Sequence, residues 1–346
     1  MNEKSDIQNL SLEDLKKFCF ENEIKEFRAK QIFEWIWNKR VDSFKKMTSL
    51  SINIRDLLND SFVINKITIH KKQKSKDKTI KYSLKTHDSL LLEAVLIPSK
   101  KRVTVCLSSQ IGCSLSCNFC ATGMLKLERN LNASEMYDQV YILNQESIKY
   151  FGKKISNIVF MGMGEPLLNY NELLKSINLL TSNQGLGISA RRITVSTAGI
   201  AKMIKKLGDD KVRFNLAVSL HNAENNKRNL LMPINEKIPL SQLKDAIIHF
   251  YNKTGTRVTY EYILFKNIND SISDAKKLAH FTKITPCKIN LIEYNKVEDI
   301  NYTNSSKEST LDFINYLENK NLIVNLRKSK GKDIDAACGQ LINRLK

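Results

Sequence analysis

Three cysteines fall within eight consecutive positions of this 346-residue chain. Cys113, Cys117 and Cys120 lie in the segment CSLSCNFC, and neither a second Cys-x-x-Cys pair nor a pair of closely spaced histidines accompanies them. A structural zinc ion takes four protein ligands. Three thiolates suit a four-iron cluster better, because the protein then holds three irons and leaves the fourth open to another ligand. The spacing therefore favours an iron–sulfur cluster, with zinc as the weaker alternative.

The elements that must hold this loop follow a regular alternation from about residue 102 onward. The strand-like runs are RVTVCLS, NIVFMG, RRITVST, RFNLAVSL, RVTYEYILF and KINLIEY, and a helix-like run follows each of them. Six strand-then-helix units in succession predict a parallel sheet. Because a complete barrel has eight units, we expect an α/β fold built on a partial (β/α)6 barrel.

Polar residues stand where these predicted strands end, which is the edge at which such barrels carry their chemistry. The cysteine loop follows the first strand, and GMGEP follows the second. The later strand ends supply Ser196, Thr197, Ser219, His221, Tyr294 and Asn295. Any one of them could be an ordinary loop residue, but together they predict one polar rim.

Four segments are expected along the chain. Residues 1–60 show helical spacing of apolar residues and a capping pattern at Ser11, which predicts an N-terminal helical accessory domain. Residues 61–100 look like short linking strands, residues 101–332 form the barrel core, and residues 333–346 form a C-terminal segment.

The charge balance points to a polyanionic partner. The chain has 55 Lys and Arg against 36 Asp and Glu, a formal net charge of +19. Such an excess attracts nucleic acid, although a solubilising surface or a genomic bias towards lysine would produce it too. Seven cysteines, an odd number, argue against a disulfide framework. The N-terminus lacks an apolar signal region, and no long apolar run is present, so we expect a cytoplasmic protein without a membrane partner.

Several motifs together carry a family resemblance. The segments CLSSQIGCSLSCNFCATG, FMGMGEPLLN, RRITVSTAG, AVSLH, LMPIN and DIDAACGQL resemble the RlmN/Cfr family of radical S-adenosylmethionine RNA methyltransferases. The resemblance runs from the N-terminal helical segment almost to the C-terminus. It implies a radical-SAM barrel, a [4Fe-4S] cluster and S-adenosyl-L-methionine as cofactors. The N-terminal helical segment is the natural candidate for holding the RNA.

The activity that the resemblance implies is methylation of an adenine ring carbon in RNA. Two S-adenosylmethionine molecules would be used per cycle, one to methylate a cysteine and one to yield a 5′-deoxyadenosyl radical. Pro166 in GMGEP favours the adenine-C2 branch, which is associated with 23S rRNA and tRNA. A monomer served by a one-electron reductant such as flavodoxin is expected. Adenine-C8 methylation, as in the Cfr-like branch, and a non-enzymatic RNA-binding or assembly protein remain alternatives.

The resemblance also implies three catalytic roles. Cys338 would carry the methyl group, and Cys106 would resolve the RNA adduct by forming a disulfide with Cys338. Glu93, in an otherwise apolar strand, would be the base that removes the ring proton. From the residues alone, Cys338 is better interpreted as a buried core cysteine. The alternation in VTVCLS allows Cys106 to be either a core residue or a reactive thiol, and Glu93 could be an outward-facing carboxylate on an edge strand.

The cofactor contacts carried over from the family fall on the same predicted rim. Cys113, Cys117 and Cys120 match the cluster ligands, and Phe119 precedes the last of them. The positions matching S-adenosylmethionine contacts are Gly164, Glu165, Ser196, Ser219, Leu220, His221 and Asn295.

Overall fold

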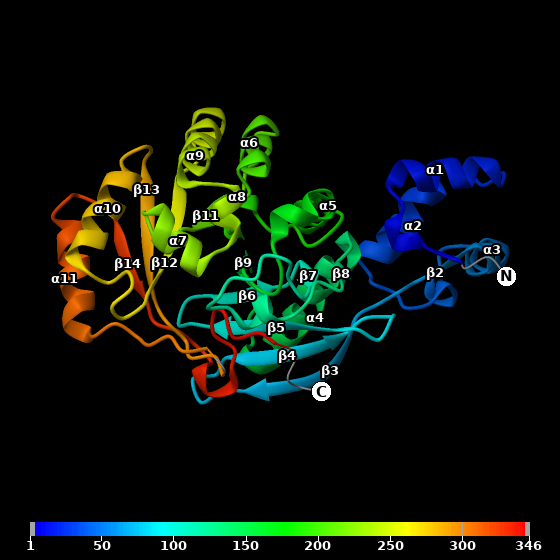
Figure 1. The fold of residues 1–346 in the computed structure, drawn as a ribbon. Helices are drawn as coiled ribbons and strands as arrows, with labels where there is room; N and C mark the ends of the chain where they lie inside the picture. Colours follow the sequence, from blue (N-terminus) through cyan, green and yellow to red (C-terminus); the bar gives the residue numbers. More distant parts are fainter. Residues whose placement is uncertain (1–3, 299, 343–346) are drawn as a thin grey trace.

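A ten-stranded sheet organises the computed structural model, which describes residues 4–298 and 300–342 (Figure 1). The strand order is β14-β13-β12-β11-β10-β9-β6-β5-β4-β3. Seven neighbouring strands run parallel: β6 (Val103–Leu107), β9 (Asn157–Phe160), β10 (Ile193–Thr197), β11 (Asn215–Ser219), β12 (Val258–Leu264), β13 (Cys287–Glu293) and β14 (Val324–Arg327). The expected α/β partial barrel is confirmed.

A long helix precedes the next strand after each parallel strand up to β13, as the alternation in the sequence predicts. These helices are α4 (Ala133–Phe151), α5 (Tyr170–Thr181), α6 (Ala201–Asp209), α9 (Leu240–Thr254), α10 (Ile272–Thr282) and α11 (Lys307–Glu318). The signals that bound α4 are local. Asn132 and Glu135 form a capping box at its start, and Gly152 ends it with a φ of 63°.

The strands of residues 61–100 are part of the main sheet. Strands β3 (Thr68–Lys74), β4 (Ile80–Lys85) and β5 (Leu91–Pro98) extend it as an antiparallel meander that joins the parallel array at β6. Cys106 on β6 stands opposite Val95 on β5, and Val95 stands opposite Lys81 on β4. This segment, expected only to link two domains, thus builds one wall of the barrel.

The N-terminal helices form a unit at one side of the barrel (Figure 1). It contains α1 (Leu12–Glu21), α2 (Phe27–Trp37) and α3 (Ile52–Ser61), with β1 (Ser5–Asp6) and β2 (Phe62–Val63) pairing at its base. The unit is fastened to α4 of the barrel. Arg40 and Asp138 form a buried ion pair, and the Tyr137 hydroxyl donates to the Trp37 carbonyl at 2.7 Å. The predicted capping box at Ser11 forms with Asp14.

Two further helices lie between β11 and α9 and were not predicted: α7 (Asn225–Leu231) and α8 (Ile234–Lys237). The shorter elements are β7 (Gln110–Ile111), β8 (Arg129–Asn130), η1 (Ile7–Asn9), η2 (Phe44–Lys46), η3 (Ala121–Met124), η4 (Pro166–Asn169), η5 (Ala190–Arg192) and η6 (Lys332–Ile334). After β14 the chain returns towards β4, and the last four residues of the predicted C-terminal segment lie outside the described part. Within residues 4–298 and 300–342, no helix has both the length and the apolar character needed to span a membrane.

Candidate active site

A cavity of about 270 Å³ opens at the carboxyl ends of the parallel strands. Most of the predicted site residues line it: Cys106, Cys113, Cys117, Phe119, Cys120, Gly164, Glu165, Ser196, Ser219, His221 and Cys338. Three do not. Glu93 is buried on β5, Leu220 is buried behind the strand end, and Asn295 lines a neighbouring hollow. Most of the predicted rim therefore lines one cavity, whereas Tyr294 and Asn295 line the neighbouring hollow.

The cysteine loop forms one end of this cavity. Its backbone is anchored to α7, because the Asn118 amide donates to the Leu231 carbonyl at 3.0 Å and the Asn118 side chain donates to the Leu230 carbonyl at 2.7 Å. Burial raises the pKa of the Cys113 thiol to about 11 and raises that of the Cys117 thiol further. Without a bound metal these thiols are therefore neutral at pH 7, whereas coordination to a metal removes the proton.

The residues fit an iron–sulfur cluster through the chemistry of their donors. Across the described residues, no three Cys, His, Asp or Glu side chains converge closely enough to hold a single metal ion. The fit rests instead on three soft thiols that share one end of a cavity, the donor type that iron–sulfur clusters take. The Oδ1 atom of Asn295 is also buried without a hydrogen-bond partner in the structure. It is an acceptor that a bound cofactor could satisfy.

Gly164 and Glu165 form the second wall of the cavity. Gly164 has a φ of 91°, and a Cβ atom there would lie 2.4 Å from the Cβ atom of Gln110. The Glu165 carboxylate accepts from the backbone amides of Ala198 at 2.7 Å and Leu167 at 3.0 Å. Burial nevertheless raises the pKa of Glu165 to about 7. The GMGEP motif thus places a buried carboxyl group with a raised pKa among the strand ends.

His221 is a buried structural acceptor at the end of β11. Its backbone has a φ of 53°, and its Nδ1 atom accepts from the Ile263 amide at 3.1 Å. The ring packs edge-on against Phe119, with centroids 4.8 Å apart. Burial, and secondarily the nearby Arg228 charge, lower the pKa of His221 to about 3. The imidazole is therefore neutral and ties the cysteine loop to strands β11 and β12.

Arg228 supports the strand ends around the cavity, a role that the sequence did not reveal. Its buried guanidinium donates to four oxygen atoms: the carbonyls of Ala198, Ser219 and Leu220 and the side chain of Asn235. Burial lowers the pKa of Arg228 to about 10, so it remains charged at neutral pH. One side chain from α7 thus fixes the ends of β10 and β11 relative to each other. Its place in a short, polar helix gave no signal of this role.

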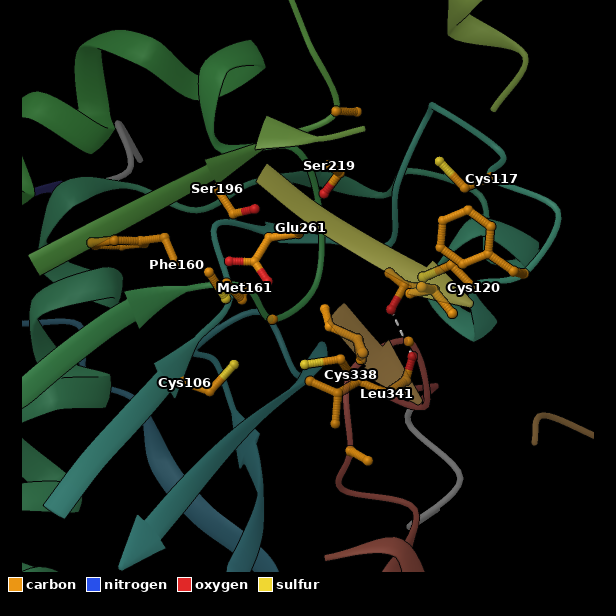
Figure 2. A pocket seen from close by; sticks show the side chains of 18 of the residues that line it. Cys106, Cys117, Cys120, Phe160, Met161, Ser196, Ser219, Glu261, Cys338 and Leu341 are labelled. Carbon is orange, nitrogen blue, oxygen red and sulfur yellow. Dashed lines mark hydrogen bonds between the residues drawn. The ribbon is translucent and has the colours of Figure 1, made fainter. Parts of the chain in front are cut away.

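Glu261 is a second residue that sequence reasoning missed. It lies on β12 inside the cavity, in the region of Ser196 and Ser219 (Figure 2). Burial raises its pKa, although the Asn290 side chain donates to its Oε1 atom at 2.8 Å. The only sequence signal was a carboxylate between two tyrosines in an otherwise apolar strand.

Cys106 and Cys338 face each other across the cavity. Figure 2 shows their sulfur atoms pointing towards one another, from β6 and from the C-terminal segment. Cys106 is 8% exposed, and burial followed by the neighbouring Cys338 raises the pKa of its thiol. Cys338 is solvent-accessible, although the surrounding cavity walls raise its thiol pKa as well. Cys338 is therefore not the buried core cysteine that its sequence context alone allowed.

The segment carrying Cys338 is held on both sides of that residue. The Ala121 amide donates to the Gly339 carbonyl at 2.7 Å, and the Thr122 hydroxyl donates to the Leu341 carbonyl at 2.7 Å, the bond drawn at Leu341 in Figure 2. Asn295 donates its side-chain amide to the Cys338 carbonyl at 3.3 Å. The cysteine loop and the Cys338 segment are thus packed directly together.

The upstream part of the same segment is fastened to the β3–β4 turn. The Ser75 hydroxyl donates to the Asp333 carboxylate at 2.6 Å, and the Gly331 amide donates to Asp77 at 3.0 Å. The meander therefore supports the C-terminal segment as well as the barrel wall.

Glu93 is fully buried on β5 and does not face outward. Its Oε2 atom accepts from the Ile342 amide at 2.9 Å. Its strand environment is less apolar than expected, because the Lys81 ammonium on β4 lies 3.5 Å from its Oε1 atom. The carboxylate is thus close to the Cys338 segment, but beneath the cavity surface.

Comparison with known proteins agrees with this fold. Residues 5–64 match the family model of the ribosomal RNA large subunit methyltransferase N-terminal domain, and residues 107–279 match that of the radical SAM superfamily. The crystal structure of a radical SAM methyltransferase from Sphaerobacter thermophilus superposes with a TM-score of 0.91 at 35% identity, covering 99% of this chain and 100% of that one. Fold and site together define a radical SAM enzyme.

Relatives that match over nearly the whole chain identify the family within the radical SAM enzymes. A probable dual-specificity RNA methyltransferase RlmN of Christiangramia forsetii is 52% identical over 341 residues, which cover 99% of this chain and 97% of the relative. A probable dual-specificity RNA methyltransferase RlmN of Salinibacter ruber is 42% identical over 349 residues, which cover 99% of this chain and 95% of the relative. The chain belongs to the RlmN family and is a radical SAM RNA methyltransferase, not a non-enzymatic RNA-binding protein. Membership implies a [4Fe-4S] cluster and S-adenosylmethionine.

Proposed function

We propose that this enzyme methylates C2 of adenine in 23S rRNA and in tRNA, through a methylated Cys338. The observation that carries the proposal is the arrangement of thiols in one cavity. Cys338 and Cys106 face each other in the cavity that Cys117 and Cys120 also line (Figure 2), and Cys113 of the same loop lines it too. The relatives' description as dual-specificity RNA methyltransferases supports two classes of RNA substrate.

Cys113, Cys117 and Cys120 would hold the [4Fe-4S] cluster, and Phe119 packs beside them. When bound, the cluster supplies one electron to S-adenosylmethionine, which yields the 5′-deoxyadenosyl radical needed to functionalise a methyl group. The protein's own part is to position the cofactors and the substrate and to exclude water. Gly164, Glu165, Ser196, Ser219 and His221 would surround S-adenosylmethionine within the cavity, with Leu220 and Asn295 bordering it.

Cys338 would accept a methyl group from one S-adenosylmethionine, and a second molecule would be spent on its activation. The adenine–Cys338 adduct would lose one electron to a one-electron acceptor and its ring proton to Glu93. Cys106 would then attack the Cys338 sulfur and break its bond to the methylene carbon, which would take up a proton and leave as the methyl group of the RNA. The two sulfurs would remain as a disulfide, which a dithiol reductant would have to reduce before the next cycle. Each of these steps needs the Cys338 segment at the cavity, where its contacts with Ala121 and Thr122 hold it.

The proposal includes partners beyond the catalytic cavity. The N-terminal unit and the net charge of +19 would hold the RNA, because phosphate attraction is independent of sequence. A one-electron reductant such as flavodoxin would serve a monomeric, cytoplasmic enzyme.

Nucleoside analysis tests the position of methylation. Protein reconstituted anaerobically with iron and sulfide would be incubated with S-adenosylmethionine, a reductant and unmethylated 23S rRNA or tRNA. Digestion and mass spectrometry against standards should give 2-methyladenosine from both RNAs. Formation of 8-methyladenosine would establish the C8 alternative instead. Product from only one RNA would remove the claim of dual specificity.

A further inference from the structure

Lys81 is a buried cation to which the proposed reaction assigns no role. It lies on β4 with 3% of its surface exposed. Its Nζ atom is 3.5 Å from the Glu93 Oε1 atom and donates to the Asp335 carbonyl at 3.3 Å. Lysine is rarely buried without a partner, because removing its charge from water is costly. Lys81 therefore occupies this position at a cost that its two partners must offset.

The sheet register explains why these groups meet. Lys81 stands opposite Val95, and Ser83 stands opposite Glu93, so Lys81 and Glu93 are diagonal neighbours on one face of the β4–β5 pair. Cys106 on β6 is opposite Val95 and lies on the same face. Three adjacent strands thus present an ammonium, a carboxylate and a thiol towards the C-terminal segment.

The contacts of this pair bracket Cys338 in the sequence. Lys81 holds the carbonyl of Asp335 on the N-terminal side of Cys338. Glu93 accepts from the amide of Ile342 on its C-terminal side. Since Lys81 also neutralises Glu93, the ion pair and the two backbone contacts form one connected unit.

We propose that Lys81 is a positioning residue, which orients the Glu93 carboxylate and holds the Cys338 segment in register with it. This inference rests on the proposed function, in which Glu93 takes the ring proton of an adduct carried by Cys338. A base must lie within hydrogen-bond reach of its proton. The ammonium of Lys81 fixes both the base and the segment that presents the adduct, so the two move together.

The first test compares variants of Lys81 at the step that uses Glu93. Lys81→Met keeps most of the length of the side chain but leaves a buried carboxylate without its cation. We expect resolution of the RNA adduct to slow by about tenfold or more, as removal of one partner of a buried pair is costly. Quenched time courses would show crosslinked RNA accumulating on denaturing gels. Lys81→Arg, which retains the charge, should recover much of the rate.

A double-mutant cycle separates positioning from general damage. If Lys81 acts through Glu93, the Lys81→Met/Glu93→Gln enzyme should resolve the adduct no more slowly than Glu93→Gln alone, because the residues share one function. If the two substitutions instead slow adduct resolution by factors that multiply in the double variant, the proposal is overturned. The double variant also removes both charges, so it should fold even if the uncompensated carboxylate prevents Lys81→Met from folding.

A second measurement needs neither RNA nor cofactors. In the full-length protein, Lys81→Met should accelerate amide hydrogen exchange in the peptide containing residues 335–342. A matched control is Arg40→Met, which removes another buried cation from its pair with Asp138, remote from this segment. It should lower the melting temperature without accelerating exchange in that peptide or increasing adduct accumulation relative to product.

The outcomes distinguish this inference from the proposed function. If neither Glu93→Gln nor Cys106→Ala accumulates adduct, the proposed function fails. If both do, while Lys81→Met resolves adduct at the wild-type rate and leaves exchange of residues 335–342 unchanged, only the role of Lys81 is refuted.

Discussion

Single residues in this cavity are constrained by their backbone as much as by their side chains. Gly164 combines a φ of 91° with close contact to the side chain of Gln110, whose Oε1 atom in turn accepts from the Glu165 amide at 2.8 Å. A Cβ atom at this position would push directly against that support. The shape of the proposed S-adenosylmethionine site therefore depends on the absence of a side chain here.

Gly164→Ala should weaken S-adenosylmethionine binding by about tenfold or more, because both the backbone strain and the displaced Gln110 alter the site. Gly152→Ala is the matched control, since Gly152 also has a positive φ but a Cβ atom added there would meet nothing within 4 Å beyond its chain neighbours. It should cost about 1 kcal/mol of stability and leave binding unchanged. Calorimetric titration of reconstituted protein with S-adenosylmethionine, beside thermal unfolding, checks both expectations. Equal affinities for the two variants would contradict this account of Gly164.

His221 should make the protein sensitive to acid. Its pKa is lowered to about 3 in the folded state, against about 6.5 in an unfolded chain. Between these values the unfolded state binds the additional proton, so the free energy of unfolding falls as pH decreases, by at most about 1.4 kcal/mol per pH unit. The contribution is fully present above pH 6.5 and is lost as pH falls towards 3.

Replacement of this imidazole should reduce that pH dependence. His221→Asn keeps a side-chain acceptor for the Ile263 amide and tolerates the positive φ, but it does not titrate in this range. Urea unfolding of the metal-free protein at several pH values between 4 and 7 would measure the difference. Identical slopes for wild type and His221→Asn would refute the role given to burial.

At the scale of elements, the regular units were predictable and the irregular ones were not. The alternation of strand and helix was visible because strands and helices bury residues at different periods. Helices α7 and α8 were missed because they span only seven and four residues, too few for a periodic pattern. The inclusion of β3–β5 in the main sheet depends on pairing between β5 and β6, which strand propensity does not reveal.

The site shows the same division. The cysteine spacing and the strand-end motifs located the cavity, because those residues are close in sequence or repeat at each strand end. The roles of Arg228, Glu261 and Lys81 depend on contacts between distant segments. A lysine or glutamate within a strand gives no sign of which face it occupies until the register is known.

Helix α7 should act as a clamp, which means that its Arg228 stabilises the ends of β10 and β11 by hydrogen bonds to their carbonyls. Arg228→Met would leave the carbonyls of Ala198, Ser219 and Leu220 without their shared donor. We expect a loss of about 3 kcal/mol or more in the free energy of unfolding, since several buried acceptors become unsatisfied. Lys227→Met is the control on the same helix, because its partly exposed ion pair with Asp274 should contribute only about 1 kcal/mol. Denaturant titration would compare them, and similar losses for both variants would argue against the clamp.

At the scale of the whole molecule, the fold brings the two ends of the catalytic region together. Cys106 comes from the first parallel strand, and Cys338 comes from the segment beyond the last one. The partial barrel leaves an opening at its strand ends, and the chain returns across this opening to the β3–β4 turn. The meander, the cysteine loop and the C-terminal segment thus close one site that no single segment could form.

The most direct test of the central claim is the fate of RNA on Cys106→Ala. This variant retains Cys338 and should take up the methyl group, attack adenine and then stall, because no thiol is available to release the adduct. Denaturing electrophoresis should show protein crosslinked to RNA, and mass spectrometry should place the bond at Cys338. Cys338→Ala should give neither crosslink nor product. A Cys106→Ala enzyme that turns over at the wild-type rate without crosslinked RNA would contradict the account.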